Sequence, residues 1–415
     1  MKPPAVEVLI VTRLLRAGGA ERQAMVLAGH LAEEGRAVGV LAFRPDPEVA
    51  LPTGVRLLLS DEVGVTRDAR WRRATAPADR VLSVLTMRAS QIASRQGVHP
   101  SLRRAAHRSA VGPALRGFGN AGRTIRRFVE STGATSVVAF LPSMYCAATL
   151  GLWDLNVRLI ASYRNDPTQP VIKAHWRGMQ HLVAERADVF GANTLAGAAW
   201  VHEQLAPRRQ AAPVFMPNIL AALPVRLAPA TRRFIVVSRL VAVKRVDAVV
   251  YAFAALRDEL PDWELIIAGD GPERPALEQL IEDLGLCLRC RMLGQVPVEP
   301  LLSEGGVLVH PSTMEGTPNA VMEAMSHGIS SIVTAGSPGP VELVAGTIPD
   351  SSVGPAGVVI PPDDTVALAE AMRTVAAVPG IRDRLAANAR TRAERMTWPV
   401  LREEWLRIID GSDRR

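Results

Sequence analysis

A short apolar run followed by a helical pattern recurs along the chain, and this alternation constrains the fold more than any other feature. Val6–Thr12 is apolar, Gly18-Gly19 marks a turn, a helical pattern runs from Glu21 to Glu34, and Ala37–Phe43 is apolar again. Strands and helices that alternate in this way predict a parallel sheet covered by helices. The chain therefore opens as an α/β domain.

The same alternation occurs in both halves of the chain, and the two halves are separated by an irregular segment. In the first half, further strands are expected at Thr135–Phe140, Val157–Ala161, Asp188–Ala192 and Val214–Asn218. In the second half, strands are expected at Phe234–Ser238, Trp263–Ala268, Arg291–Leu293, Gly306–His310 and Ser331–Thr334, with helices starting at Asp247, Pro275 and Pro318. Between the halves, residues 219–233 contain Pro224 and Pro229 and show no period, which is typical of a linker.

We therefore expect an α/β protein with two doubly wound, Rossmann-like domains. The predicted boundaries are 1–218 for the N-terminal domain, 219–233 for the linker, 234–395 for the C-terminal domain and 396–415 for a C-terminal helix. That helix is amphipathic, with Leu401, Trp405 and Ile408 on one side. We expect it to pack back on the N-terminal domain.

Composition is that of an ordinary globular protein of 415 residues, 48% hydrophobic and 21% charged. Three cysteines form no disulfide framework and favour a reducing compartment. Cys287 and Cys290 are interpreted as a buried thiol pair on a strand, in preference to a zinc or redox site. The first residues resemble a strand rather than a leader peptide, and no apolar run reaches the length of a membrane span. A cytoplasmic protein is expected.

Positive charge is concentrated in one segment. Between Ser60 and Glu130 fourteen arginines face five acidic residues, whereas the whole chain carries a net charge of +7. Apolar residues interleave with these arginines, which favours peripheral association with an anionic membrane over nucleic-acid binding. A solvated arginine-rich face is the equally weighted alternative.

Several turns after strands could hold an anion, because ligands of parallel sheets bind where strands lead into helix N-termini. The turns are "GGAER" (18–22), "VSRLVAVKR" (237–245), "AGDGPERP" (268–275) and the segment from His310. Each is weak alone. Lys244 is more informative, because the chain has only three lysines and uses arginine for almost every other positive charge. A lysine just after a strand suggests a point charge for a phosphate.

The stretch "EGTPNAVMEAMSHG" (315–328) places two glutamates eight positions apart around a helix start. We expect Thr317 to cap this helix, Pro318 to occupy its first position and Gly328 to follow its end. Its amide groups would then bind an anion, Glu323 would accept hydrogen bonds from a ribose, and Glu315 would face a sugar. The alternative is that Glu315 only favours the helix dipole and Glu323 is a solvated charge.

In combination, these motifs resemble the retaining glycosyltransferases of family 4, which have the two-domain GT-B fold. The matching stretches are "GGAER", "RADVFGANT", "FMPNI", "VSRLVAVKRVD", "IIAGDGPE", "LGQV" and "EGTPNAVME", and they occur in the order found in the family. Residues 45–135 match least. The resemblance implies a nucleotide-diphosphate sugar, a UDP- or GDP-sugar, bound mainly by the C-terminal domain and an acceptor bound by the N-terminal domain across a cleft.

The resemblance also implies a function for each matching residue. Arg239 and Lys244 would hold the diphosphate, Glu323 the ribose and Glu315 the donor sugar, with Arg239, Lys244 and Glu315 as the catalytic set. The implied donor-binding set also contains Gly18, Gly19, Gly294, Gln295, Val296, Gly316, Thr317, Asn319 and Ala320. Gly294, Gln295 and Val296 would lie near the nucleobase, and Gly18 and Gly19 would approach the phosphate from the other domain.

The acceptor side departs from the family pattern. "SYRNDP" (162–167) resembles a Ser-Glu-Arg-Asn-Asp-Pro stretch of relatives that build surface polysaccharides and lipid-linked sugars, but Tyr163 replaces the glutamate. Arg164, Asn165 and Asp166 are the acceptor-side candidates, and a structural ion pair is an equal alternative for Arg164. A lipid-linked or glycan acceptor is implied.

The sequence has no Asp-x-Asp motif for a metal and no glycosidase-like pair of carboxylates. Protein cations and helix amides would therefore stabilise the leaving diphosphate without a metal or other cofactor. The resemblance implies retention of configuration by front-face attack. Two alternatives stay open: a sugar-nucleotide epimerase or phosphorylase on the same scaffold, and a non-catalytic membrane-surface protein.

Overall fold

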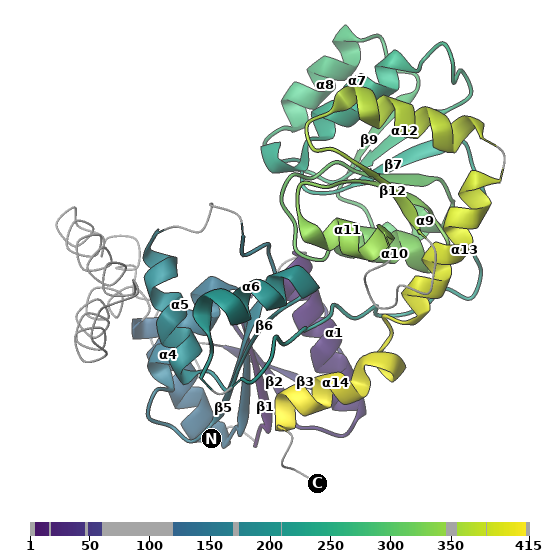
Figure 1. Cartoon of the computed structure of the whole chain (residues 1–415). Helices are drawn as coiled ribbons and strands as arrows, with labels where there is room; N and C mark the ends of the chain where they lie inside the picture. Colours follow the sequence, from purple (N-terminus) through teal and green to yellow (C-terminus); the bar gives the residue numbers. More distant parts are fainter. Residues whose placement is uncertain are drawn as a thin grey trace. The chain divides into compact units, whose positions relative to one another are not determined.

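The structure, a computed structural model, describes residues 5–15, 18–45, 49–59, 119–168, 174–208, 210–345, 355–378 and 380–411. They form two compact units (Figure 1). The N-terminal unit contains residues Met1–Met216 and Arg402–Arg415, and the C-terminal unit contains Pro217–Leu401. Each unit is built on its own six-stranded parallel sheet, which confirms the predicted α/β architecture.

The sheet of the N-terminal unit has the strand order β3-β2-β1-β4-β5-β6. Its strands are β1 (Val8–Leu15), β2 (Val38–Pro45), β3 (Val55–Leu59), β4 (Ser136–Phe140), β5 (Arg158–Tyr163) and β6 (Val189–Ala192). Its helices are α1 (Gly19–Glu33), a helix over 119–132, α4 (Pro142–Gly151), α5 (Ala174–Arg186) and α6 (Leu195–Leu205). All the strand pairs are parallel, as βαβ connections require.

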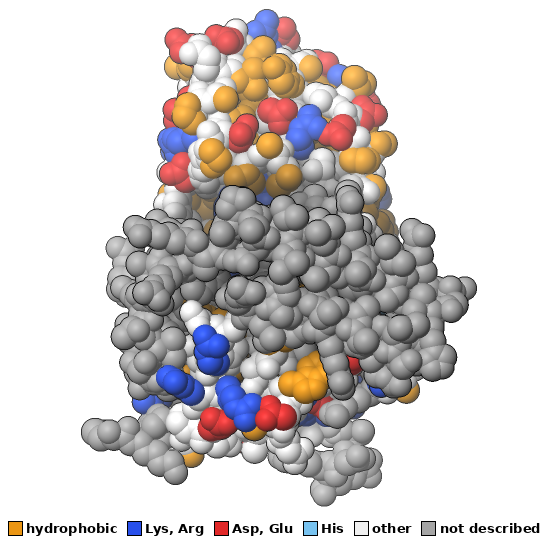
Figure 2. Space-filling model, turned by 90° about the vertical axis from the view of Figure 1, so that its left-hand side faces the viewer, with side chains coloured by type: hydrophobic (Ala, Val, Ile, Leu, Met, Phe, Trp, Pro, Cys, Tyr) orange, Lys and Arg blue, Asp and Glu red, His pale blue; other side chains and the backbone are white. Residues whose placement is uncertain are grey.

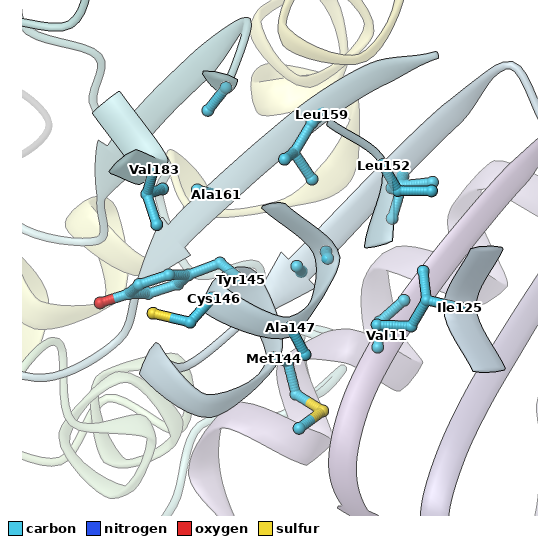
Figure 3. Packing of buried hydrophobic residues seen from close by; sticks show 14 of the residues in the cluster. Val11, Ile125, Met144, Tyr145, Cys146, Ala147, Leu152, Leu159, Ala161 and Val183 are labelled. Carbon is cyan, nitrogen blue, oxygen red and sulfur yellow. The ribbon is translucent and has the colours of Figure 1, made fainter. Parts of the chain in front are cut away.

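Alternate strand residues of this sheet point to opposite faces, and each face has its own helices. On one face Val11, Leu159 and Ala161 pack against the helix over 119–132 and against α4, as Figure 3 shows for Ile125, Met144 and Leu152. On the other face α1 contacts β1, β2, β3 and β4. The strands are therefore buried on both sides, which explains their almost continuous apolar sequence.

The last helix, α14 (Trp398–Asp410), packs on the N-terminal unit through its second half. Trp405, Ile408 and Ile409 are buried. Arg36 Nη1 lies 2.9 Å from Asp410 Oδ1, and Arg158 Nε donates to the Ile408 carbonyl at 3.0 Å. The predicted return of the C-terminal helix to the N-terminal domain is confirmed.

The sheet of the C-terminal unit has the order β12-β11-β10-β7-β8-β9. Its strands are β7 (Arg233–Val237), β8 (Glu264–Ala268), β9 (Cys290–Gly294), β10 (Val307–His310), β11 (Ser331–Thr334) and β12 (Gly357–Ile360). Its helices are the 3₁₀ helix η3 (Ala242–Lys244), α7 (Val246–Ala255), α8 (Arg274–Asp283), α9 (Val298–Ser303), α10 (Asn319–Ser326), α11 (Pro338–Ala345), α12 (Thr365–Ala377) and α13 (Ile381–Glu394).

Two apolar cores cover the two faces of this second sheet. Phe234, Val236 and Ile267 point toward the core that contains residues of α7, α8 and α12. The intervening residues Ile235 and Ile266 point toward the core that contains residues of α10, α11 and α13. The alternation places helices on both sides, as Figure 1 shows.

Three sequence predictions need correction. The segment Val214–Asn218 is no strand of either sheet: only Phe215 bridges to Ala192, and Pro213 and Pro217 lack the N–H that a longer ladder needs. The prediction missed β3 and β12. Cys287 is exposed and only Cys290, the first residue of β9, is buried, so the two thiols are not a buried pair.

Most of the basic segment, residues 60–118, lies outside the described residues. Its described end is helical, and there Arg126 pairs with Glu130 and Asp154 at 2.8 and 2.5 Å. On the face of the molecule in Figure 2, acidic and basic side chains of the C-terminal unit are mixed. In the described ranges, no helix is long and apolar enough to cross a bilayer.

Candidate functional site

The candidate site lies at the point of the C-terminal sheet where the strand order reverses. β7 and β10 are neighbours, and the chain continues from β7 toward β8 on one side and from β10 toward β11 on the other. Loops that leave two such strands in opposite directions open a crevice at their carboxyl ends. Here the two loops also contact each other, since Thr313 N donates to the Val243 carbonyl at 2.9 Å.

Three charged or polar side chains meet at this point. Lys244 ends η3, in the loop after β7, and its ammonium forms an ion pair with Glu315 Oε1 in the loop after β10. His310, the last residue of β10, places Nε2 3.0 Å from the same oxygen. The side chains of Lys244, Glu315 and His310 are 14%, 17% and 5% exposed, so water screens the group only in part.

The surroundings of Glu315 keep its carboxyl ionised. Burial by itself would raise the pKa, but the hydrogen bond to His310 and the positive charge of Lys244 together outweigh it and bring the pKa of Glu315 to about 2. An anionic carboxylate, a partly exposed lysine and an imidazole therefore share one place at the end of the sheet.

Backbone and side-chain hydrogen bonds fix the loop that carries Glu315. Glu315 N donates to Ser337 Oγ at 2.8 Å, and Thr334 Oγ1 donates to the Ser312 carbonyl at 2.6 Å. Asn218 Nδ2 donates to the Thr317 carbonyl at 3.0 Å. The asparagine of the "FMPNI" stretch thus holds the loop in front of α10.

Helix α10 follows this loop and places the second glutamate. Pro318 is the N-cap, no side chain caps the helix, and its first turn begins with Asn319 and Ala320. The prediction that Thr317 caps it is wrong, because Asn218 binds the carbonyl of Thr317 and Pro318 takes the cap position.

The other residues of this stretch have distinct surroundings. Gly316 is buried and Thr317 half-buried, while Glu323 lies half-buried in α10, one turn beyond Asn319. Gly328 follows the helix in the left-handed region at φ 69°, as expected for its C-terminal end.

Arg239 lies in the loop after β7 and is exposed. The glycines of "AGDG" pack against this loop: a Cβ on Gly269 would collide with the Ser238 carbonyl, and one on Gly271 with the Leu240 carbonyl. The two glycines therefore allow the loops after β7 and β8 to lie in contact, and they support the position of Arg239.

The residues expected near a nucleobase lie at the end of β9. Gly294 ends the strand with φ 71°, Gln295 is exposed and Val296 packs against the core that contains α10. Together with Arg239, Lys244, Glu315 and Glu323, these residues all belong to the C-terminal unit.

Gly18 and Gly19 belong to the N-terminal unit, where Gly18 is the N-cap of α1 and Gly19 its first residue. The buried Glu21 carboxylate lies directly over Gly18, so that a Cβ at position 18 would collide with it. An acidic side chain thus occupies this helix N-terminus, which the macrodipole favours.

The acceptor-side candidates follow β5. Arg164 is buried, donates to the Met216 carbonyl at 3.2 Å and stacks over Phe140, with Cζ 4.2 Å from the ring centre. Burial lowers its pKa to about 9. Asp166 is also buried and accepts from Thr168 N and Oγ1, whereas Asn165 is exposed. Of the three residues, only Asn165 presents an exposed side chain.

His310, Ser337 and Asn218 are the site residues that sequence reasoning assigned no function. His310 could have been noticed as a polar residue that ends a buried apolar strand, five positions before Glu315. Nothing in the sequence connects Ser337 or Asn218 with the loop they hold, because each contact joins distant parts of the chain.

Residues 225–392 match the family described as "Glycosyl transferases group 1", and this range lies entirely within the C-terminal unit. Among curated relatives, the chain is 31% identical over 180 residues to an exopolysaccharide phosphotransferase of Streptomyces coelicolor, covering 42% of this chain and 18% of that protein. It is 33% identical over 156 residues to the alpha-D-kanosaminyltransferase of Streptomyces kanamyceticus, covering 37% and 38%.

A third relative is an alpha-1,4-N-acetyl-D-galactosaminyltransferase of Campylobacter jejuni, named for a PP-undecaprenol-linked sugar. It is 28% identical over 149 residues, covering 36% of this chain and 39% of that protein. The chain therefore matches well under half the length of each of these relatives.

Solved structures match the fold over almost the whole chain. Anabaena HepE, in complex with UDP and glucose, aligns with a TM-score of 0.68 at 17% identity, covering 96% of this chain and 98% of that one. WaaG, a glycosyltransferase involved in lipopolysaccharide biosynthesis, aligns with a TM-score of 0.60 at 18% identity, covering 98% and 100%. The expected GT-B fold of two Rossmann-like units is confirmed.

Proposed function

We propose that this chain, whose C-terminal unit contains a glycosyl transferases group 1 domain, is a glycosyltransferase. It moves a sugar from a nucleotide-diphosphate sugar to a lipid-linked or glycan acceptor, with retention of configuration. The observation that carries the proposal is the meeting of Lys244, Glu315 and the start of α10 at the switch point of the C-terminal sheet. This is where open α/β sheets bind nucleotides.

The donor site follows from these positions. Lys244 and the exposed Arg239 lie in one loop and supply positive charge for the diphosphate, together with the amide groups at the start of α10. As the bond to the sugar breaks, negative charge grows on the diphosphate, and preorganised cations stabilise it. Glu323 accepts from the ribose, and Glu315 accepts from the sugar. No metal takes part.

The acceptor is bound by the N-terminal unit. The Campylobacter relative is named for a PP-undecaprenol-linked sugar, which supports a lipid-linked acceptor here as well. Asn165 is our acceptor-side candidate, because it is exposed, whereas Arg164 is packed against Phe140. Arg164 then has a structural function and supports the acceptor region through its packing against Phe140.

A thermal-shift screen of UDP-, GDP- and ADP-sugars tests the donor site. UDP-sugars are the first candidates, since HepE was solved with UDP and glucose. A ligand that binds only the native state raises the melting temperature. No shift with any nucleotide sugar would contradict the proposal. Conversion of a nucleotide sugar in the absence of an acceptor would indicate an epimerase or phosphorylase instead.

We also propose that the chain is cytoplasmic and associates peripherally with anionic membrane through residues 60–130. Each arginine near an acidic bilayer contributes on the order of 1 kcal/mol, and salt screens the attraction. Co-sedimentation with vesicles should therefore rise with the fraction of acidic lipid and fall with added salt.

Replacement of Arg72, Arg73, Arg103 and Arg104 by glutamine should weaken this co-sedimentation and leave donor affinity unchanged. These four residues lie outside the described residues, and the donor site lies in the other unit. Equal binding to neutral and acidic vesicles would favour the alternative interpretation of the segment as a solvated arginine-rich face.

A further inference from the structure

His310 is the imidazole that contacts the Glu315 carboxylate among the described residues. It ends β10, whose four residues are all buried, and β10 is hydrogen-bonded to β7 on one side and to β11 on the other. The backbone of His310 itself pairs with Val333 of β11, whereas the pairing with β7 covers Val307 and Leu308. Its side chain is 5% exposed, and Nε2 lies 3.0 Å from Glu315 Oε1.

The direction of this hydrogen bond follows from the chemistry of the carboxylate. Ionised Glu315 has no hydrogen to give, so His310 Nε2 must carry the hydrogen and donate it. Lys244 donates to the same oxygen, Oε1. Both donors therefore converge on one oxygen, and Oε2 has no hydrogen-bond partner among the described residues.

We propose that His310 is a positioning residue that holds the Glu315 carboxylate in place when Lys244 turns to the diphosphate of the donor. This inference rests on the proposed function, in which one lysine has to serve both the resting carboxylate and the arriving phosphate. Lys244 is the exchangeable partner of Oε1, because its charge sits on a long flexible stem. His310 is the permanent partner, because its ring is buried on a strand.

The arrangement assigns the two carboxylate oxygens to different tasks. His310 and the Ser337 contact to the backbone fix Oε1 and the loop, which leaves Oε2 directed to a hydroxyl of the donor sugar. Loss of His310 would let the carboxylate rotate away from the sugar once Lys244 has turned to the diphosphate. The effect should therefore fall on the sugar part of the donor and spare the nucleotide part.

The test compares the binding of nucleotides with and without a sugar by isothermal titration. The probes are UDP, UDP-glucose, UDP-N-acetylglucosamine and GDP-mannose, and the variants are His310→Phe and His310→Gln. The Phe side chain has no hydrogen-bond donor for Glu315, whereas the Gln side chain retains an N–H that reaches toward Glu315. His327→Gln is the matched control, since His327 is buried to the same degree in the same unit but bonds to Ser326 and to the Glu323 carbonyl.

His310→Phe should weaken the sugar nucleotide that binds wild type best by roughly tenfold or more, as expected for a lost charge-assisted hydrogen bond, and change UDP affinity by less than about twofold. His310→Gln should recover most of the loss, and His327→Gln should behave as wild type.

Three results would overturn the inference. His310→Phe could weaken UDP and the sugar nucleotide equally, or weaken neither. If His310→Phe does not fold, the test rests on His310→Gln. An equal loss of affinity for UDP and for the sugar nucleotide in that variant would also overturn the inference. Failure of the proposed function looks different, because wild type itself would then bind none of the four probes.

Discussion

The two sheets of this protein have the same topology but different chemistry at the same place. Counted from the first strand of each unit, both follow the order 3-2-1-4-5-6, so each has a switch point between its first and fourth strands. In the C-terminal unit the switch point holds Lys244, Glu315 and His310. In the N-terminal unit it lies between β1 and β4.

The described residues at the N-terminal switch point differ from the Lys244, Glu315 and His310 cluster. After β1 comes the glycine turn into α1, with Glu21 already lying over Gly18. After β4 comes α4, whose residues Met144, Tyr145 and Cys146 are buried in the core (Figure 3). The described residues at this point supply one buried carboxylate, Glu21, and two exposed arginines, Arg13 in β1 and Arg22 in α1, but no lysine.

The difference teaches that topology provides a crevice and that the residues after the strands decide what binds there. A charged cluster at one switch point suits a diphosphate and a sugar. This division suits a donor in one unit and an acceptor in the other.

The largest expected effect tests whether the second half of the last helix, from Arg402 on, belongs to the N-terminal unit. Trp405 is 1% exposed and lies near Arg164, whose Cζ is 5.5 Å from its ring centre. Trp405→Ala should lower the free energy of unfolding of the N-terminal unit by about 3–5 kcal/mol. Urea unfolding with and without nucleotide separates the two units, because nucleotide shifts only the transition of the unit that binds it.

Val400→Ala is the control for this variant. Val400 lies on the same helix and is 57% exposed, so its truncation should change stability by less than about 0.5 kcal/mol. If Trp405→Ala moved both transitions equally, the second half of the helix would not belong to the N-terminal unit alone.

The next effect concerns turnover at the charged switch point. Arg239→Ala or Lys244→Ala should each slow transfer by roughly 10²–10³-fold, as the loss of one preorganised stabilising contact does. Arg239→Ala should leave the melting temperature nearly unchanged because Arg239 is exposed, whereas Lys244→Ala should lower it because the Glu315 carboxylate loses one of its partners. Arg232→Ala is the matched control, because Arg232 is an exposed arginine of the same unit paired with Asp262. If both site variants transferred sugar at the wild-type rate, the diphosphate would have to bind at another place.

A smaller effect should appear in the pH dependence of stability. The pKa of Glu315 in the folded protein, about 2, lies below its ordinary value of 4.5. A lowered pKa stabilises the fold fully above the unfolded-state value, and this contribution is lost as the pH falls through the folded-state value. Wild type should therefore exceed Glu315→Gln in unfolding free energy above about pH 4.5, and the gap should close toward pH 2. A gap that stays constant from pH 7 to pH 2.5 would exclude this linkage.

The smallest expected effect is that of metal removal. If Lys244 and Arg239 stabilise the leaving diphosphate as Mg²⁺ does in other enzymes, the transfer rate in excess EDTA should stay within about twofold of the untreated rate. The measurement is initial velocity with and without EDTA, with added Mg²⁺ as a further arm. Complete loss that Mg²⁺ or Mn²⁺ restores would show that Lys244 and Arg239 do not suffice.

The sequence predicted the strands that are buried on both sides, because a short, almost continuous apolar run bounded by turn residues is typical of such a strand. Ser331–Thr334 was predicted to the residue, and β4 and β8 each to within one residue at the start. It did not predict β3 and β12, each of which lies at one edge of its sheet. With a single neighbouring strand and partly exposed residues, β3 has a weaker apolar pattern than the central strands.

For the candidate site, unusual residues were predictable and their partners were not. Lys244 was noticed because lysine is rare in this chain, and Glu315 because of its distance from Glu323. Their direct ion pair depends on the contact between two loops that are 71 residues apart in the sequence. Burial of Arg164 likewise depends on packing against Phe140, which no local pattern records.

The return of α14 has a consequence for synthesis on the ribosome. The C-terminal unit is one continuous stretch, Pro217–Leu401, and it can fold as soon as that stretch has left the exit tunnel. The N-terminal unit is made first but lacks residues 402–410 until the whole C-terminal unit has been translated. Until then the nascent chain exposes the apolar surface that Trp405, Ile408 and Ile409 later cover. The half that is translated first is therefore the half that is completed last.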